Sequence, residues 1–143
     1  MTGATDSYAA ALTAEHAAIY GYGVVGAHLD AATQGAARDA EASHRNRRDD
    51  LLLRLSTGGA TPPAAAAAYT LPFPVTDRDA AMKLAIALEE GTARAWRSAL
   101  AATKDGDRKL CLEALTDCAV RATQWKTTAV LSPVIVPFPG APA

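Results

Sequence analysis

Residues 76–104 read TDRDAAMKLAIALEEGTARAWRSALAATK, and this stretch decides the fold class. Thr76 is a suitable capping residue, and Asp77 and Asp79 place negative charge in the first turn, where the helix dipole favours it. Gly106 is a residue at which this helix can end. Core-type side chains recur at the three- to four-residue period of a helix with one buried face: Met82, Ile86, Glu89, Ala93, Trp96 and Leu100. The stretch therefore predicts a helix from about residue 76 to residue 104.

The same period recurs in three further segments, which predict helices over residues 6–32, 37–56 and 107–128. Gly35 is expected to end the first of them, and Asp107 to cap the last. Only a few residues separate the first helix from the second and the third from the fourth. Because short links make neighbouring helices antiparallel, residues 1–143 are expected to form one all-α domain of two helical hairpins.

Two segments rich in proline and apolar residues lie outside these helices. Residues 58–75 are long enough, at about 3.1 to 3.3 Å per extended residue, to run the length of a bundle. We therefore expect them to form a crossover between the hairpins. Residues 132–143 carry four prolines among apolar residues and are expected to lie extended along a groove of the bundle or of a partner subunit.

The amino-acid composition and net charge of the chain exclude several classes of function. The chain has 143 residues, of which 50% are hydrophobic and 20% charged, as in a globular domain with its own core. A net charge of −1 provides no overall field for capturing nucleic acid or an anionic membrane. The sequence begins without a signal-like segment, and Cys111 and Cys118 are about 10 Å apart on one predicted helix, too far for a disulfide. A cytoplasmic protein with reduced cysteines is expected.

Two local motifs have ordinary structural interpretations. Residues 21–26, GYGVVG, match the spacing of a dinucleotide-binding loop, but that loop requires a strand-to-helix turn and residues 9–20 are helical in pattern. We interpret these glycines as a close helix contact. The arginines between residues 45 and 54 are interrupted by Asp49 and Asp50, which is typical of a solvated helix face.

Acidic residues on the inner helix faces are the informative anomaly. Glu15 and Glu89 each lie within an apolar stripe, and Glu41 with His44 forms a Glu-x-x-His pair. Buried carboxylates are costly unless they are paired, hydrogen-bonded or bound to metal. Together the four residues make up three quarters of the ligand set of a di-iron carboxylate protein, so they are the candidate ligands for iron or manganese.

Several segments resemble a known family: Leu12-Thr-Ala-Glu-His16, Tyr20-Gly-Tyr22, His44-Arg-Asn-Arg-Arg-Asp-Asp-Leu51 and the proline-rich linker. They are similar to the actinobacterial ferritin-like domain family of unknown function, over nearly the whole chain. The resemblance implies a ferritin-like four-helix bundle and supplies no established activity.

The last ligands of a complete di-metal site are missing from the sequence. The helix predicted over residues 107–128 contains no histidine. If the first hairpin turns near residues 34–35, Glu15 faces Arg54 and lies roughly 20 Å along the axis from Glu41. Metals in such a site are only about 3.5 to 4 Å apart, so the spacing predicts that the site is incomplete.

The same helix spacing places basic side chains beside the inner acidic residues. We therefore expect these side chains, and not metal ions, to balance the negative charges. Arginine stays protonated and can bind a carboxylate through two hydrogen bonds. The expected polar core consists of three pairs: Arg121 with Glu89, Arg48 with Glu15, and His28 with Glu41.

These observations favour a non-enzymatic scaffold or interaction module without a cofactor, which binds neither nucleic acid nor membrane. We expect a homodimer, because the apolar tail of a monomer would be partly exposed. An alternative is a metal-dependent oxidoreductase that uses Glu15 and Glu89 with His16, His44 or Asp117. A third possibility is binding of a small apolar ligand between the hairpins.

Overall fold

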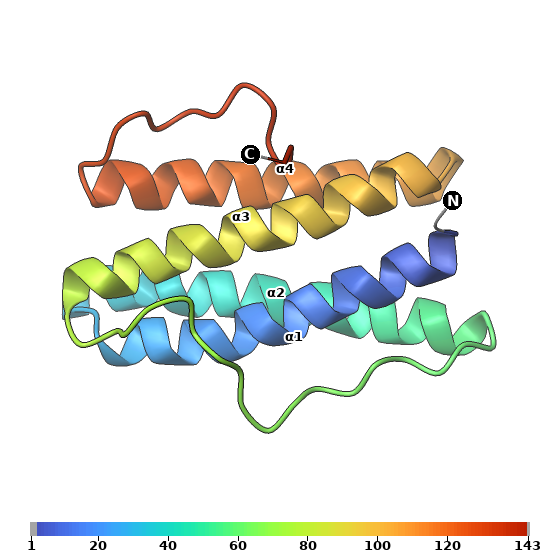
Figure 1. Ribbon diagram of the computed structural model, residues 1–143, viewed down its shortest axis with the longest axis horizontal. Helices are drawn as coiled ribbons and strands as arrows, with labels where there is room; N and C mark the ends of the chain where they lie inside the picture. The colour runs from blue at the N-terminus through green and yellow to red at the C-terminus, as the bar shows by residue number, and fades with distance from the viewer. Residues whose placement is uncertain (1–2, 143) are drawn as a thin grey trace.

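The computed structural model describes residues 3–142, which form four helices and no strand. The helices are α1 (Ala4–Ala27), α2 (Ala31–Thr57), α3 (Arg78–Ala102) and α4 (Asp105–Thr128), as Figure 1 shows. The prediction of an all-helical chain with four helices is confirmed. None of these helices combines the length and apolar character that a membrane span requires.

The four helices lie side by side along the long axis of the molecule (Figure 1). In the ribbon, α1 and α2 run in opposite directions, as do α3 and α4. α1 packs against both α2 and α3, and α3 packs against α4, so the contact between α1 and α3 joins the two halves. Residues 58–77 contain no helix and return along the bundle from the end of α2 to the start of α3.

The first turn differs from the sequence prediction, because the chain turns at residues 28–30 and not near Gly35. Asp30 is the N-cap of α2, and its carboxylate accepts hydrogen bonds from the backbone N–H of Thr33 at 3.1 Å and from its hydroxyl at 2.7 Å. The predicted bounds of 6–32 and 37–56 are therefore wrong at this junction, and Gly35 lies inside α2. The N-cap Asp30 determines where α2 starts. Gly35, at which the sequence predicts the end of the first helix, is tolerated inside α2.

This correction changes which residues of α1 and α2 face each other. A turn centred on residue 29 places Glu15 level with about residue 43 of α2, and no longer with Arg54. His44 is consequently opposite Glu15, in the middle of the bundle.

The second pair of helices also begins slightly differently from the prediction. α3 starts at Arg78, and its cap is Asp77, whose carboxylate accepts from the backbone N–H of Ala80 at 2.8 Å, in place of Thr76. α4 starts at Asp105, two residues before the expected cap Asp107. The reason is that α3 ends two residues earlier than predicted, at Ala102, so the short connection between the two helices lies at residues 103–104 and not at 105–106.

The interior consists of two apolar clusters with a buried polar layer between them. One cluster contains Leu12, Leu51 and Trp96, and the other contains Tyr22 and Trp125. The layer between them is formed by three side chains that are at most 1% exposed: Glu15, His44 and Glu89. Burying two carboxylates and an imidazole at one level requires that they compensate each other.

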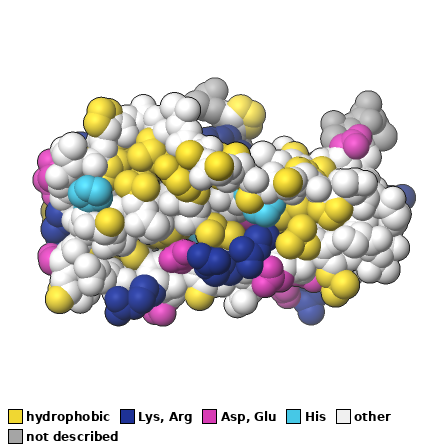
Figure 2. Space-filling view, turned by 90° about the horizontal axis from the view of Figure 1, so that it is seen from below, with side chains coloured by type: hydrophobic (Ala, Val, Ile, Leu, Met, Phe, Trp, Pro, Cys, Tyr) yellow, Lys and Arg dark blue, Asp and Glu magenta, His cyan; other side chains and the backbone are white. Residues whose placement is uncertain are grey.

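The two non-helical segments are attached to the bundle in different ways. The crossover packs Leu71, Phe73 and Val75 against the second apolar cluster, and its Pro63 carbonyl accepts a hydrogen bond from His16 Nε2 at 3.1 Å. The tail from residue 130 arches over α4 and returns to the bundle (Figure 1). Figure 2, which views the molecule from below relative to Figure 1, shows apolar patches on that face, with basic and acidic side chains next to each other between them.

Candidate functional site

The buried polar layer receives one charged or titratable side chain from each helix. His44 of α2 lies between two carboxylates: its Nδ1 is 2.5 Å from Glu15 Oε2 on α1, and its Nε2 is 3.0 Å from Glu89 Oε1 on α3. Arg121 of α4 then places Nη1 3.1 Å from Glu89 Oε2. A continuous chain of carboxylate, imidazole, carboxylate and guanidinium therefore crosses the bundle.

Aromatic side chains complete the hydrogen bonding of the two carboxylates. Trp96 Nε1–H donates to Glu15 Oε1 at 2.7 Å, and the Tyr22 hydroxyl donates to Glu89 Oε1 at 2.5 Å. Trp125 Nε1–H in turn donates to the Tyr22 oxygen at 2.9 Å. All four oxygens of Glu15 and Glu89 thus accept a hydrogen bond from the protein, which is what buried carboxylates need.

The position of His44 fixes its protonation state. Each of its ring nitrogens faces a carboxylate oxygen, and only a doubly protonated imidazolium can donate to both. Burial alone would lower the pKa of His44, but the hydrogen bonds to Glu15 and Glu89 outweigh it and raise the pKa from 6.5 to about 9. At neutral pH His44 therefore carries a positive charge inside the bundle.

Arg121 connects the buried layer to the protein surface. Its Nη2 donates to Asp117 Oδ2 at 2.8 Å and to Ser43 Oγ at 2.9 Å, and Arg47 Nη2 lies 3.9 Å from the same Asp117 oxygen. Burial would raise the pKa of Asp117, but the hydrogen bond from Arg121 lowers it below its usual value. The positive charges of three side chains, His44, Arg121 and Arg47, thus match the negative charges of Glu15, Glu89 and Asp117.

The structure brings together only some of the residues that the sequence singled out. Glu15, His44, Glu89 and Arg121 meet in the layer. Glu41, the fourth candidate metal ligand, is outside it and pairs with Arg45 on its own helix at 2.7 Å.

Two of the expected pairs do not form. His28 is the residue at which α1 ends, and its Nδ1 donates to the Val24 carbonyl at 2.9 Å, so it does not reach Glu41. Arg48 pairs with the neighbouring Asp49 at 2.8 Å, and Glu15 has His44 as its partner. Both errors follow from the misplaced first turn, which shifted every predicted neighbour of α1 along α2.

The sequence pattern does not reveal the hydrogen-bonding role of Trp96 and Trp125. The apolar stripe that predicts α3 includes Trp96 only as a packing residue. The available signal was chemical: a buried indole N–H needs an acceptor, and a buried glutamate on a facing helix provides one. Tyr22 follows the same logic, with a hydroxyl that both donates and accepts.

The donor set does not fit a di-metal centre of the ferritin-like kind. That pattern requires Glu-x-x-His on two helices, but α4 carries Cys118 and Arg121 at the corresponding spacing beside Glu89. A metal ion would have to displace a proton from His44, both of whose ring nitrogens face carboxylates, and the carboxylate oxygens already accept hydrogen bonds from protein donors. Over residues 3–142, no group of three or more His, Cys, Asp or Glu side chains is placed to hold a metal ion.

Comparison with known proteins places these features in a family. Residues 7–143 match the family described as "Domain of unknown function (DUF4439)". A solved structure described as a conserved hypothetical protein, rv2844, from Mycobacterium tuberculosis is similar with a TM-score of 0.85 and 40% identity. The match covers 90% of this chain and 99% of that one. No curated protein matches the chain.

Proposed function

Since the chain belongs to the DUF4439 family, we propose that it is a metal-free member of the ferritin-like bundles that functions by binding, as a scaffold or interaction module, and not as a redox enzyme. In this proposal the buried layer of Glu15, His44, Glu89 and Arg121 is a structural substitute for the metal centre. Its task is to hold four helices in one register.

The arrangement of the helices supports the ferritin-like part of the proposal. Two antiparallel hairpins joined by a long crossover are one of the connectivities of four-helix bundles that place polar sites between facing helices. One polar side chain from each helix at one level is also what such a site requires. Fold similarity alone gives no activity, so the residues of the layer itself have to indicate the function.

The absence of metal in this proposal is supported by one observation: every carboxylate oxygen of Glu15 and Glu89 already accepts a hydrogen bond from a protein side chain. A metal ion would need lone pairs that now accept hydrogen bonds from Trp96, His44, Tyr22 and Arg121. It would also add positive charge to a site in which side-chain cations already balance the acids. Both effects oppose metal binding, and they support a structural role for the layer.

A buried ion network of this kind contributes specificity of packing. Helices rich in alanine offer many similar ways to pack, whereas a layer of paired charges is satisfied in only one register. Trp96, His44 and Arg121 each have their hydrogen-bond partner on another helix, so a shift of any helix by one turn would leave a buried charge unpaired. This rigid bundle would then present its surface to a binding partner.

Metal content and stability of a Glu89→Gln variant test this function together. We expect the wild-type chain, purified after expression in medium supplemented with iron and manganese, to contain no stoichiometric metal by mass spectrometry. The variant should remain metal-free and lose roughly 2 to 4 kcal/mol of unfolding free energy, because His44 and Arg121 lose their shared anion.

Glu90→Gln is the matched control for this experiment. Glu90 is the next residue on α3; it is partly exposed and pairs with Lys126 outside the buried layer, so the loss of its charge should cost only about 1 kcal/mol. Its loss should change stability little and metal content not at all. One iron or manganese per wild-type chain that disappears in Glu89→Gln would refute the proposed function.

A further inference from the structure

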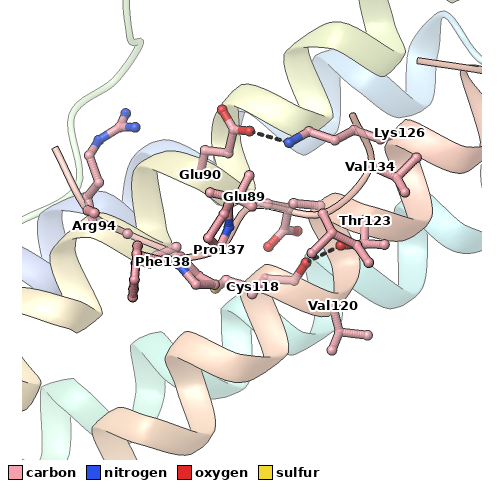
Figure 3. A pocket seen from close by; sticks show the side chains of 18 of the residues that line it. Glu89, Glu90, Arg94, Cys118, Val120, Thr123, Lys126, Val134, Pro137 and Phe138 are labelled. Carbon is pink, nitrogen blue, oxygen red and sulfur yellow. Dashed lines mark hydrogen bonds and ion pairs between the residues drawn. The ribbon is translucent and has the colours of Figure 1, made fainter. Parts of the chain in front are cut away.

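We propose that the space between the C-terminal tail and helices α3 and α4 is a binding site for a small, uncharged, apolar molecule. The inference rests on the binding role proposed above and names the site and the class of ligand. The tail and the two helices line a half-open cavity of about 680 Å³ (Figure 3). Sites for small organic molecules are typically about 300 to 1,000 Å³ in volume.

The tail is held to the bundle on both sides of the cavity. At the near end, the backbone N–H of Leu131 donates to the Lys126 carbonyl at 2.9 Å. At the far end, Arg97 Nη1 donates to the Pro139 carbonyl at 3.0 Å. Between these attachments the chain arches away from α4 (Figure 1), so the cavity lies under a segment that is fixed at two points.

Gly140 makes the far attachment possible. Its backbone approaches α3 so closely that a Cβ atom built there would lie 2.6 Å from the Ala93 carbonyl oxygen. Its φ of 75° is also in the region that glycine adopts most readily. A residue with a side chain would push the tail away from α3 and open the cavity.

The cavity is more than a gap left by loose packing. Proline fixes its own backbone angle, and the prolines of the tail favour an extended chain that cannot fold down into the space. Ile135 and Phe138 line the cavity yet are 69% and 70% exposed, so an apolar ligand would cover surface that now contacts water.

The chemistry of the lining selects the ligand class. Small residues of the helices, Ala93, Ala119 and Ala122, leave the space open, and the tail contributes Val134, Val136 and Phe138 as an apolar cover. Such a surface offers hydrophobic contact and few hydrogen bonds. An apolar molecule gains from this burial, while a strongly polar one would lose hydration without replacement.

The charged residues of the lining are either neutralised or directed elsewhere. Lys126 and Glu90 pair with each other at 2.8 Å, and Glu89 is balanced inside the bundle by His44 and Arg121. The guanidinium of Arg94 points away from the cavity in Figure 3. The cavity therefore presents no uncompensated charge to an ionic group, and the ligand that fits it is uncharged.

Fluorescence titration of the full chain with N-phenyl-1-naphthylamine, an uncharged apolar probe, tests the inference. We expect saturable binding of one probe per chain. 1-Dodecanol should displace the probe at concentrations at least about tenfold lower than dodecanoate, which has the same chain length and a charged end whose burial is costly. Equal displacement by both compounds would contradict the uncharged class, and absence of saturable binding would overturn the site.

An Ala119→Trp variant locates the binding. The indole should fill part of the cavity and weaken probe binding at least about tenfold, while Ala42→Trp, on an exposed position of α2, should leave it unchanged. A circular-dichroism melt close to that of the wild type verifies that each variant is folded. If Ala119→Trp binds the probe like the wild type, the site is elsewhere and the inference is wrong.

Light scattering and metal analysis of the same samples separate the possible failures. A second copy of the chain is the competing occupant, since the exposed tail also predicted a homodimer. A dimer that excludes the probe would assign the cavity to self-association and overturn the inference. If the protein is metal-free but does not bind the probe, only the proposed ligand site is wrong. If it contains stoichiometric metal, the proposed function is wrong.

Discussion

Replacing His44 with leucine is expected to lower the free energy of unfolding by about 3 to 5 kcal/mol, because the change leaves two buried carboxylates without the cation between them. Glu15 would retain only the indole N–H of Trp96, and Glu89 would keep Arg121 and Tyr22. Leucine has a suitable size for the site, so the loss reflects charge and hydrogen bonding more than a cavity. Urea denaturation followed by circular dichroism measures it.

His28→Leu provides the control for this substitution. His28 lies at the end of α1, half-buried, and its one side-chain hydrogen bond is to the carbonyl of the preceding turn. Its replacement should cost about 1 kcal/mol or less. If His44→Leu is as stable as the wild type, the imidazole does not balance the two carboxylates, and the account of the buried layer is wrong.

Raising the pH from 6.5 to 9 is expected to destabilise the wild-type chain by roughly 3 kcal/mol. The folded-state pKa of His44 is raised to about 9, whereas the unfolded chain has the usual value of 6.5. A group with a raised folded-state pKa stabilises the protein fully below its unfolded pKa, and this contribution is lost as the pH rises through the folded pKa. Each unit of difference corresponds to about 1.4 kcal/mol, and His44 is too deeply buried for solvent to screen the effect.

The pH effect can be assigned to His44 by repeating the measurement on His44→Leu. Between pH 6.5 and 8.5 the variant should lose much less stability than the wild type, since the titrating group is gone. Desolvation raises the pKa values of the buried thiols of Cys111 and Cys118, so these thiols destabilise the fold only once the pH rises through the thiol pKa of the unfolded chain, about 8.5 to 9, and they do so in both proteins. Equal pH profiles for both proteins would contradict an imidazolium in the core.

Much of the fold could be predicted from local patterns. The stripe from Met82 to Leu100 and the acidic first turn identified α3 within two residues at each end, because a single buried face imposes the helical period. The long segment without helix between α2 and α3 was evident from its prolines and alanines. Such patterns are local, and one element can be predicted without knowledge of its neighbours.

The pairing of side chains between helices could not be predicted with the same success. It depends on where the first turn lies, and the choice of Gly35 over Asp30 as the boundary moved the expected partner of Glu15 from His44 to Arg54. An error of a few residues in a boundary becomes a shift of about three turns between antiparallel helices. Glu15, His44 and Glu89 could therefore be chosen as unusual core residues, while their mutual contact needed the three-dimensional structure.

The nitrogen-15 and proton NMR spectrum of the His44 imidazole at pH 7, recorded before and after addition of iron(II) or manganese(II), tests the central claim most directly. With a cation formed by the side chain itself, both ring nitrogens carry a proton, and neither metal changes their signals. A ring with one unprotonated nitrogen, whose signal shifts or broadens when metal is added, would mean that a metal ion and not His44 balances the buried acids.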